Sequence, residues 1–449
     1  MPGLSRIAGG GAPRIAGAKM ALPRPSGAAP PAPGPSPEPP VKTTYESLRP
    51  SAAILIAASV MLTLALGLRQ SLGIFMQPMT RDIAISVSEF TFAIAIQNIA
   101  WGIAQPITGA LVVRMGFRRI MLAGGLFYLA GLAFLATAQG ALGVTIGAGL
   151  LIGISLACTA SSIANSVASR AVPVAIRSTV LGLVSAAGSL GAMLAAPIGQ
   201  YLQTVFDWRA GVVGFIVMAL AMIPAAWIAG RVDKVALPPP APGQGDEANA
   251  RAMVRSALRH PPFLVMTGAF FVCGMQLVFL TTHLPSYLEI CGMDPMLSAQ
   301  ALGMIGGFNI LGSLFFGWAG GRWSKQALLG LLYFTRSLVL AWFFSAAPTP
   351  ESTLLFAGVM GFLWLGVSPL IAGSVAEMFG LRWQAMIQGI AFMSHQVGST
   401  LGAFGGGLAY DFFGSYEFAW RFGVGLGLAA GTIQFLFAYL RPPPPALAR

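Results

Sequence analysis

Residues 109–120 read GALVVRMGFRRI, and residues 317–328, 208 positions later, read GWAGGRWSKQAL. Each stretch lies where one apolar run gives way to the next, with glycines before a short basic loop. Two other pairs of landmarks keep nearly the same spacing: Pro78 with Pro285, and WRAGV from Trp208 with WRFGV from Trp420. Because three pairs recur in the same order, the sequence predicts an internal duplication.

The composition places most of this chain in a lipid bilayer. Of the 449 residues, 56% are hydrophobic and 9% are charged, whereas soluble domains carry about 25% charged residues. About 20 apolar residues cross a bilayer as a helix. Twelve such runs are expected, at 51–77, 86–112, 119–138, 142–168, 178–203, 210–230, 263–288, 297–319, 327–346, 352–378, 384–410 and 417–440.

The charges predict the orientation of these twelve spans. With both termini in the cytoplasm, the tails and inner loops hold 21 of the 26 Lys and Arg residues. Three lie in outer loops (Arg81, Arg209 and Arg421), and two lie within spans (Arg69 and Arg336). This is the positive-inside bias of membrane proteins. It accounts for the net charge of +12 without nucleic acid. We expect an all-α, multi-pass protein of the cell membrane with two six-helix repeats.

The same pattern divides the chain into domains. We expect a disordered Pro- and Ala-rich tail over 1–50, without a signal peptide, and a short tail over 441–449. Six-helix bundles are expected over 51–230 and 263–440, joined by a cytoplasmic linker over 231–262. Within the linker, Arg251, Arg255 and Arg259 share one helical face. This predicts either a short amphipathic helix on the membrane surface or a solvated connection.

The repeated basic loop resembles the signature of the major facilitator superfamily between its second and third spans. The matching residues are Gly109, Leu111, Arg114, Gly116 and Arg118, with Gly317 and Arg322 in the second copy. The resemblance implies that these loops gate the inner side. Val113 and Gly321 stand where the family usually has a gate-latching Asp. The basic residues have a second interpretation, which is orientation by positive charge alone.

Longer stretches look like bacterial relatives of monocarboxylate transporters and oxalate–formate antiporters. They are GLRQSLGIFMQP, LVSAAGSLGAMLAAPIGQYL, THLPSYL, LYFTRS and SHQVGSTLGAFGGGLAYDFFGSYEFAW. The resemblance covers nearly all of 51–440. Monocarboxylate transporters carry an Asp and an Arg in span eight that bind substrate, but this chain reads GFNILGSLFFG there, with Ser313 near the Arg position. Carboxylate specificity therefore does not follow from the family alone.

Two arginines near mid-membrane indicate the chemistry of the cargo. Arg69 and Arg336 lie inside spans, whereas all 14 acids lie in tails, loops or span ends. A cation in a bilayer needs a partner. The candidates are backbone carbonyls, Tyr and amide oxygens, water, or an anionic substrate.

The two arginines differ in position. Arg69, with Gln70 beside it, lies in span one, which lines the cavity in a facilitator. We expect it to bind substrate, or else to be held by carbonyls near the outer end. Arg336 lies in span nine, a peripheral helix, on one stripe with Tyr333 and Ser337. Substrate contact and an internal structural bond both fit its pattern.

Other polar residues within spans extend the candidate substrate site. Span two carries Gln97, Trp101 and Gln105 on one face, with Asn98 alongside, and span eight carries Asn309. Such residues bind cargo or hydrogen-bond a neighbouring helix. His395, followed by Gln396 in span eleven, and His283 in span seven can each carry a coupling proton or form an interior hydrogen bond.

These features favour a transporter over an enzyme. A membrane enzyme needs a nucleophile with a base, a metal cluster or paired acids, and the sequence suggests none, nor a phosphate-binding loop. We expect no metal and no cofactor. The predicted function is secondary active transport of a small organic anion of the carboxylate class by alternating access, with proton coupling or anion exchange. The alternative is a facilitator for neutral or cationic molecules. We expect a monomer surrounded by membrane lipids.

Overall fold

The computed structural model describes residues 48–237 and 249–440. Most of the predicted tail 1–50, the middle of the predicted linker and the tail 441–449 lie outside the described residues. All regular elements of the described ranges are helical. This is expected of a chain in lipid, where a helix satisfies every backbone polar group within one segment.

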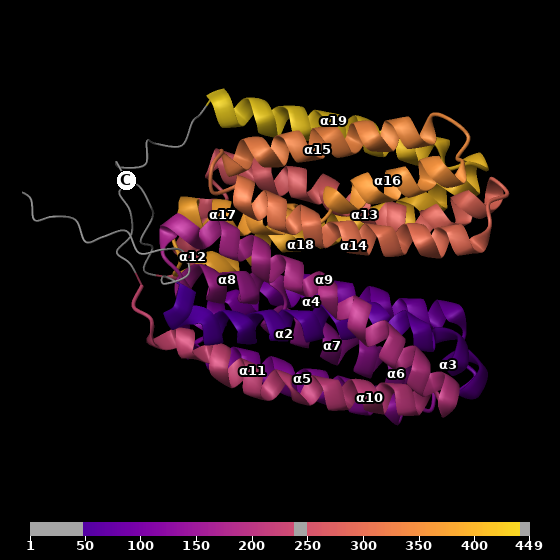
Figure 1. Ribbon diagram of the computed structural model, residues 1–449, viewed down its shortest axis with the longest axis horizontal. Helices are drawn as coiled ribbons and strands as arrows, with labels where there is room; N and C mark the ends of the chain where they lie inside the picture. The colour runs from indigo at the N-terminus through magenta and orange to yellow at the C-terminus, as the bar shows by residue number, and fades with distance from the viewer. Residues whose placement is uncertain (1–47, 238–248, 441–449) are drawn as a thin grey trace, which may run out of the picture. The chain divides into compact units, whose positions relative to one another are not determined.

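The first half of the chain forms one bundle. Its helices are α2 (Ala52–Ser71), α3 (Met76–Asp82), α4 (Val87–Met115), α5 (Phe117–Ala136), α6 (Ala141–Val144), α7 (Ile152–Thr159), α8 (Ser161–Ala171), α9 (Val174–Val205), α10 (Trp208–Leu220) and α11 (Met222–Ala229). Figure 1 shows these helices grouped together, from indigo to magenta.

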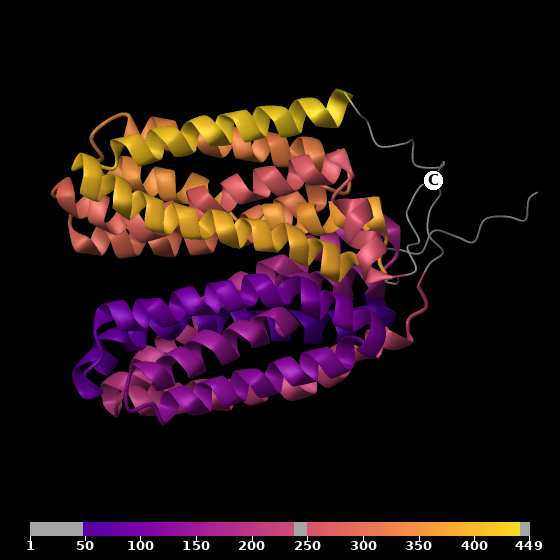
Figure 2. The ribbon, with the colours of Figure 1, turned by 180° about the vertical axis from the view of Figure 1, so that it is seen from behind.

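The second half forms another bundle, coloured orange to yellow in Figures 1 and 2. Its helices are α13 (Pro261–Ile290), α14 (Pro295–Ala319), α15 (Lys325–Phe344), α16 (Pro350–Phe362), α17 (Val367–Phe379), α18 (Gln384–Phe413) and α19 (Glu417–Leu440). The short helix α12 (Ala250–Ala257) precedes α13. Its Met253 and Ala257 are fully buried against the second bundle, while Arg251 and Arg255 are exposed.

Eleven helical stretches among the described residues have the length and composition to cross a membrane. The remaining predicted span is α18, which has 30 residues. It is more polar than the others because Gln384, Gln388, His395 and Gln396 interrupt its apolar residues. A polar helix of this length suits a position between other helices better than one facing lipid.

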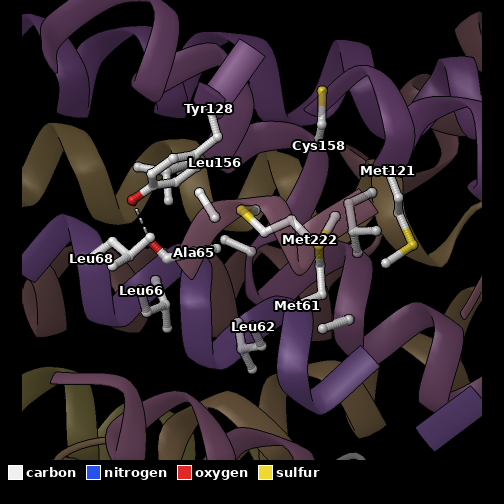
Figure 3. Close-up of a cluster of buried hydrophobic side chains, with 14 of the residues drawn as sticks. Met61, Leu62, Ala65, Leu66, Leu68, Met121, Tyr128, Leu156, Cys158 and Met222 are labelled. Atoms are coloured by element: carbon white, nitrogen blue, oxygen red, sulfur yellow. Dashed lines mark hydrogen bonds between the residues drawn. The ribbon is translucent and has the colours of Figure 1, made fainter. Parts of the chain in front are cut away.

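The core of the first bundle is built around α2. Met61, Leu62 and Leu68 of this helix are buried and pack with side chains from α5, α7 and α11 (Figure 3). Tyr128 of α5 donates its hydroxyl to the carbonyl oxygen of Ala65 at 3.1 Å. Because no water is present in the bilayer core, this bond is what allows a buried phenol at that depth.

Spans four and ten are interrupted. Span four is α6, a π-helical stretch (Thr145–Leu151), α7 and α8, with an extended residue at Ala160. Span ten breaks between α16 and α17, around Leu363–Gly366. At this break the side-chain oxygen of Asn309 accepts a 2.7 Å hydrogen bond from the amide of Leu365. Non-helical backbone is tolerated at this depth because protein groups satisfy it.

Candidate functional site

Arg69 lies near the C-terminal end of α2 and is held by two amides of α4. Its Nε donates to Oε1 of Gln97 at 2.9 Å, and its Nη2 donates to Oδ1 of Asn98 at 2.5 Å. Gln97 is itself fixed, because its Nε2 donates to the carbonyl of Ala148 in span four at 2.6 Å. The guanidinium carbon lies 5.2 Å from the centre of the Trp101 ring. A half-buried cation is thus oriented by neutral groups and an indole.

The same group of residues reaches the second bundle. Nε2 of Gln396, in α18, donates to the backbone oxygen of Asn98 at 3.2 Å and lies 3.3 Å from its side-chain oxygen. This approach needs Gly102, since a Cβ there would lie 3.1 Å from the Cβ of Gln396. Trp101 also packs on Phe392 of α18, with ring centres 4.6 Å apart. Asn98 therefore joins Arg69 to the other half of the chain.

His395 lies beside this link. Its Nδ1 is 3.4 Å from Oε1 of Gln396 and 3.4 Å from the hydroxyl oxygen of Ser399, both long for hydrogen bonds. Its ring packs against Phe270, with centres 4.5 Å apart, and Phe392. Because its polar contacts are weak, the imidazole can change partners when it gains a proton.

The structure brings together five of the predicted site residues: Arg69, Gln97, Trp101, His395 and Gln396. Gln70 is adjacent in sequence but is exposed. Asn98, which the sequence placed alongside Gln97, connects the two halves, and Phe392 is a further contact that sequence reasoning missed. Asn98 neighbours Gln97 in span two, and Phe392 precedes His395 by one helical turn. Both residues could therefore be identified from their spacing to a predicted site residue.

Arg336 has a different environment, inside the second bundle. It is fully buried, and its Nε and Nη2 donate to Oε1 of Gln276 at 3.2 and 3.1 Å. Its Nη1 lies 3.2 Å from the sulfur of Cys273, and its guanidinium carbon lies 5.2 Å from the centre of the Tyr333 ring. Gln276 in turn donates to Ser337 and to the carbonyl of Gly423. These contacts tie α15 to α13 and α19.

An apolar pocket of about 380 Å³ lies next to this network, between α13, α18 and α19. Gln276 is the one polar side chain in its lining, and Arg336 does not line it. The pocket therefore offers an anionic molecule no charged partner.

His283 and Asn309 lie within the second half as well. Nε2 of His283 is 2.9 Å from the carbonyl of Ala403, and its ring packs on Phe279 and Tyr416. A Cβ at Gly406 would lie 2.6 Å from this ring, so the glycine makes room for it. Asn309 bonds the broken span ten, as described above. Both side chains have contacts within one bundle that account for their burial.

The repeated loop motif brings the two halves close at the basic ends of the helices. A Cβ on Gly109 would collide with the backbone of Ala385 and Met386 at the start of α18. A Cβ on Gly317, the equivalent residue of the second copy, would collide with Gly182 in α9. Side-chain bonds reinforce this region, such as Gln384 with Ser169 at 2.9 Å. Two symmetry-related glycines thus let backbones meet across the halves.

An acid from the end of span six, Asp233, lies at the first copy of the loop motif. Asp233 accepts hydrogen bonds from the amides of Phe117 and Arg118, at 2.8 and 3.0 Å, and so caps α5. It approaches across Gly116, whose φ of +80° favours glycine. Arg118 places its guanidinium 4.5 Å from the centre of the Trp227 ring. Arg114 is exposed, and the Arg322 guanidinium lies 4.2 Å from the centre of the Trp318 ring.

In the second half, Glu377 of α17 bonds Lys325 at the start of α15 at 2.5 Å. It also interacts electrostatically with Arg177, at the start of α9 in the first half. The inner contact between halves therefore has one charged component in addition to the glycine packing. Sequence reasoning missed both acids because neither lies within the repeated motif.

Comparison with known proteins agrees with this architecture. The sequence model of the Major Facilitator Superfamily matches residues 55–393. Monocarboxylate transporter 13 of Bos taurus is 23% identical over 368 residues, which cover 81% of this chain and 83% of that protein. The uncharacterized MFS-type transporter YcxA of Bacillus subtilis (strain 168) is 25% identical over 356 residues, covering 76% of this chain and 84% of that protein.

Two solved structures share the fold. The proton:xylose symporter XylE bound to 6-bromo-6-deoxy-D-glucose superposes with a TM-score of 0.64 at 13% identity, covering 88% of this chain and 97% of that one. The transporter FucP in its outward conformation gives a TM-score of 0.64 at 16% identity, covering 88% and 99%. The family match spans most of the chain, and the helices form the two expected bundles. The chain accordingly belongs to the Major Facilitator Superfamily and is a multi-pass transporter of the plasma membrane.

Proposed function

We propose that this transporter moves a small organic anion, of the carboxylate class, by alternating access between the two sides of the membrane. The observation that carries the proposal is the environment of Arg69. Its guanidinium is bonded to the neutral side-chain oxygens of Gln97 and Asn98 and lies next to the face of Trp101. Water solvates a cation poorly at this depth. An anionic cargo would therefore stabilise the Arg69 guanidinium more than any neutral cargo would.

The link between halves supplies a means for cargo to affect conformation. Asn98 Oδ1 lies within hydrogen-bond range of donors from both bundles, Arg69 at 2.5 Å and Gln396 at 3.3 Å. A carboxylate bound to Arg69 would compete with Asn98 for the guanidinium. The amide of Asn98 could then bond Gln396 more strongly, which changes the contact between α4 and α18. Cargo binding and movement of the halves are coupled if the two states bind the anion with different affinity.

The side of the membrane from which cargo enters is proposed from the positions of close backbone contacts between the two halves. The close contacts at Gly109 and Gly317 lie at the basic ends of the helices, which the charge pattern predicts to face the cytoplasm. A Cβ on Gly303, Gly306 or Gly307, toward the other end of α14, would meet nothing within 4 Å. Cargo in this conformation would therefore reach Arg69 from the outside. The chain would work as a monomer, because one copy supplies residues from both halves.

His395 is the candidate for proton coupling. When neutral, its Nδ1 can accept from Ser399 if that hydroxyl turns from the carbonyl of His395, to which it donates at 2.9 Å. When protonated, Nδ1 must donate, and Oε1 of Gln396 is an acceptor 3.4 Å away. Protonation of His395 would then affect the cargo through a series of contacts, from His395 to Gln396, to Asn98 and to Arg69. Anion exchange without a proton remains the alternative mode.

A neutral sugar-like cargo is the second candidate, and the amides favour it. Gln97, Asn98 and Gln396, with Trp101, offer the donors, acceptors and ring face that hydroxylated molecules use. Two neighbours in fold are sugar symporters by name, xylose for XylE and fucose for FucP.

Counterflow into liposomes containing the purified protein distinguishes the candidates. Vesicles loaded with an unlabelled compound would be tested for uptake of the labelled form, across carboxylates, neutral sugars and cationic dyes. We expect exchange of at least one carboxylate and none of the dyes. Exchange of a sugar without any carboxylate would replace the first candidate with the second, and exchange of a dye alone would contradict both.

A further inference from the structure

The second bundle has a groove on its side that the transport mechanism does not use. It encloses about 700 Å³ and is formed by α14, α15, α19 and the loop before α15. Apolar side chains dominate its lining, among them Phe315, Phe316, Leu328, Leu331, Phe435 and Ala438. At one end lie Arg322, Trp323, Ser324 and Tyr439, and at the other lie Thr335 and Leu363.

The length of the groove corresponds to one leaflet. Along α15 it extends from Ser324 to Thr335. Eleven residues of helix rise about 16 Å. Half of a hydrocarbon core of about 30 Å is about 15 Å. The apolar part therefore matches the depth that one acyl chain occupies.

The polar end has the composition of a membrane interface. Trp323 and Tyr439 are 54% and 66% exposed, and such rings gather at the level of lipid headgroups. The guanidinium of Arg322 is exposed and lies 4.2 Å from the centre of the Trp318 ring, whose centre is 5.5 Å from that of Trp323. Glu377 bonds Lys325, the first residue of α15. Arg322 thus presents positive charge at the mouth of an apolar groove.

We propose that this groove binds one anionic phospholipid from the leaflet on the side of the basic loops. Its phosphate pairs with Arg322, its glycerol region lies against Trp323 and Tyr439, and one acyl chain follows α15 between Leu331 and Phe435. Charge complementarity selects an anionic headgroup, since the cation is not neutralised within this loop. The site depends on membrane insertion and is independent of the cargo proposed for Arg69.

The duplication supplies a matched control. Arg114 holds the position in the first copy of the motif that Arg322 holds in the second, 208 residues later, and it is also exposed. Arg322→Gln and Arg114→Gln each remove one exposed cation from equivalent loops. Ala438→Trp fills the apolar part of the groove and leaves both arginines in place.

The experiment is native mass spectrometry of the purified full-length protein in detergent, titrated with phosphatidylglycerol or phosphatidylcholine. We expect one tightly bound phosphatidylglycerol and a preference over phosphatidylcholine that Arg322→Gln lowers about fivefold. Arg114→Gln should keep the preference, and Ala438→Trp should lose the bound lipid. Thermal melting in detergent would confirm that each variant is folded.

Three results would overturn the proposal. Equal binding of the two lipids by the unmodified protein would show that the groove does not select lipids by the charge of the headgroup. An equal effect of Arg322→Gln and Arg114→Gln would indicate general attraction to a basic surface. Retention of the lipid by folded Ala438→Trp would place it outside this groove.

Discussion

Arg69 and Arg336 are both arginines inside spans, and the hydrogen bonds of both go to neutral groups, yet their surroundings differ. Arg69 is half-buried, lies where the two bundles meet, and is linked through Asn98 to Gln396 of the other half. Arg336 is 0% exposed and bonded to Gln276 and Cys273 of its own half. The same residue type is therefore partly exposed at the contact between the halves in one place and enclosed by protein in the other.

This difference shows how a bilayer protein can hold a cation without an acid. Around Arg336 an amide, a thiol and a tyrosine ring, all from the second half, surround the guanidinium. Around Arg69 two amides orient the guanidinium, and one of them, Asn98, contacts Gln396 of the second half. Depth in the membrane marks both arginines as unusual. Their position relative to the interface between halves is the basis on which we propose a role in transport for Arg69 and a structural role for Arg336.

The largest effect is expected at Arg69. Changing Arg69→Gln keeps an amide at the site but removes the charge that would bind a carboxylate. Loss of a charge-assisted hydrogen bond of ~3 kcal/mol should lower initial uptake of the anion about 100-fold. Uptake into proteoliposomes measures this, with thermal melting as the control for folding. Uptake within a few-fold of the unmodified protein would show that Arg69 does not contact the cargo.

The second effect is on stability and concerns Arg336. Arg336→Gln removes the donors to Gln276 and leaves buried polar groups with fewer partners. We expect the free energy of unfolding to fall by about 2 kcal/mol, measured by denaturation in detergent. The apparent affinity for the anion should be unchanged in the protein that remains folded. A variant as stable as the unmodified protein, but with weakened affinity, would reverse the assignment.

A smaller effect is expected at the link between halves. Gln396→Ala removes the donor to Asn98 and should lower the maximal uptake rate about fivefold, as expected for one hydrogen bond of ~1 kcal/mol. Thr400→Ala is the matched control, because Thr400 lies one turn later in α18 and bonds only within that helix. Equal rates for the two variants would indicate that the Asn98–Gln396 contact has no part in transport.

Substitution of His395 is expected to change the rate of cargo exchange least. His395→Gln should abolish acceleration of uptake by an inward proton gradient, because Gln cannot gain a proton. Counterflow at equal pH on both sides should stay within about twofold, since exchange needs no net proton movement. Uptake that still responds to the gradient would remove His395 from coupling.

Much of the architecture could be predicted from the sequence, since lipid forces apolar segments into helices. The twelve spans and the duplication followed from hydropathy and from the repeated loop after Gly109. The breaks in spans four and ten could not be predicted, because Ala160 and Leu363 are not themselves residues that interrupt helices. Their cause is tertiary, as the bond from Leu365 to Asn309 illustrates.

The candidate site was predicted only in part for a similar reason. Sequence position gives the depth of a residue in the membrane but not which neighbour it meets. Tyr333, Arg336 and Ser337 indicated a polar stripe, while the partner of Arg336 is Gln276 on another helix, 60 residues away. Asp233 could not be assigned to the loop at Gly116 either, because it reaches that loop from the end of span six.

The most direct test of the account is a calorimetric titration of the transported anion into three purified proteins: the unmodified chain, Arg69→Gln and Arg336→Gln. We predict that Arg69→Gln loses measurable binding, while folded Arg336→Gln binds with the affinity of the unmodified protein. Binding lost in Arg336→Gln and retained in Arg69→Gln would contradict it.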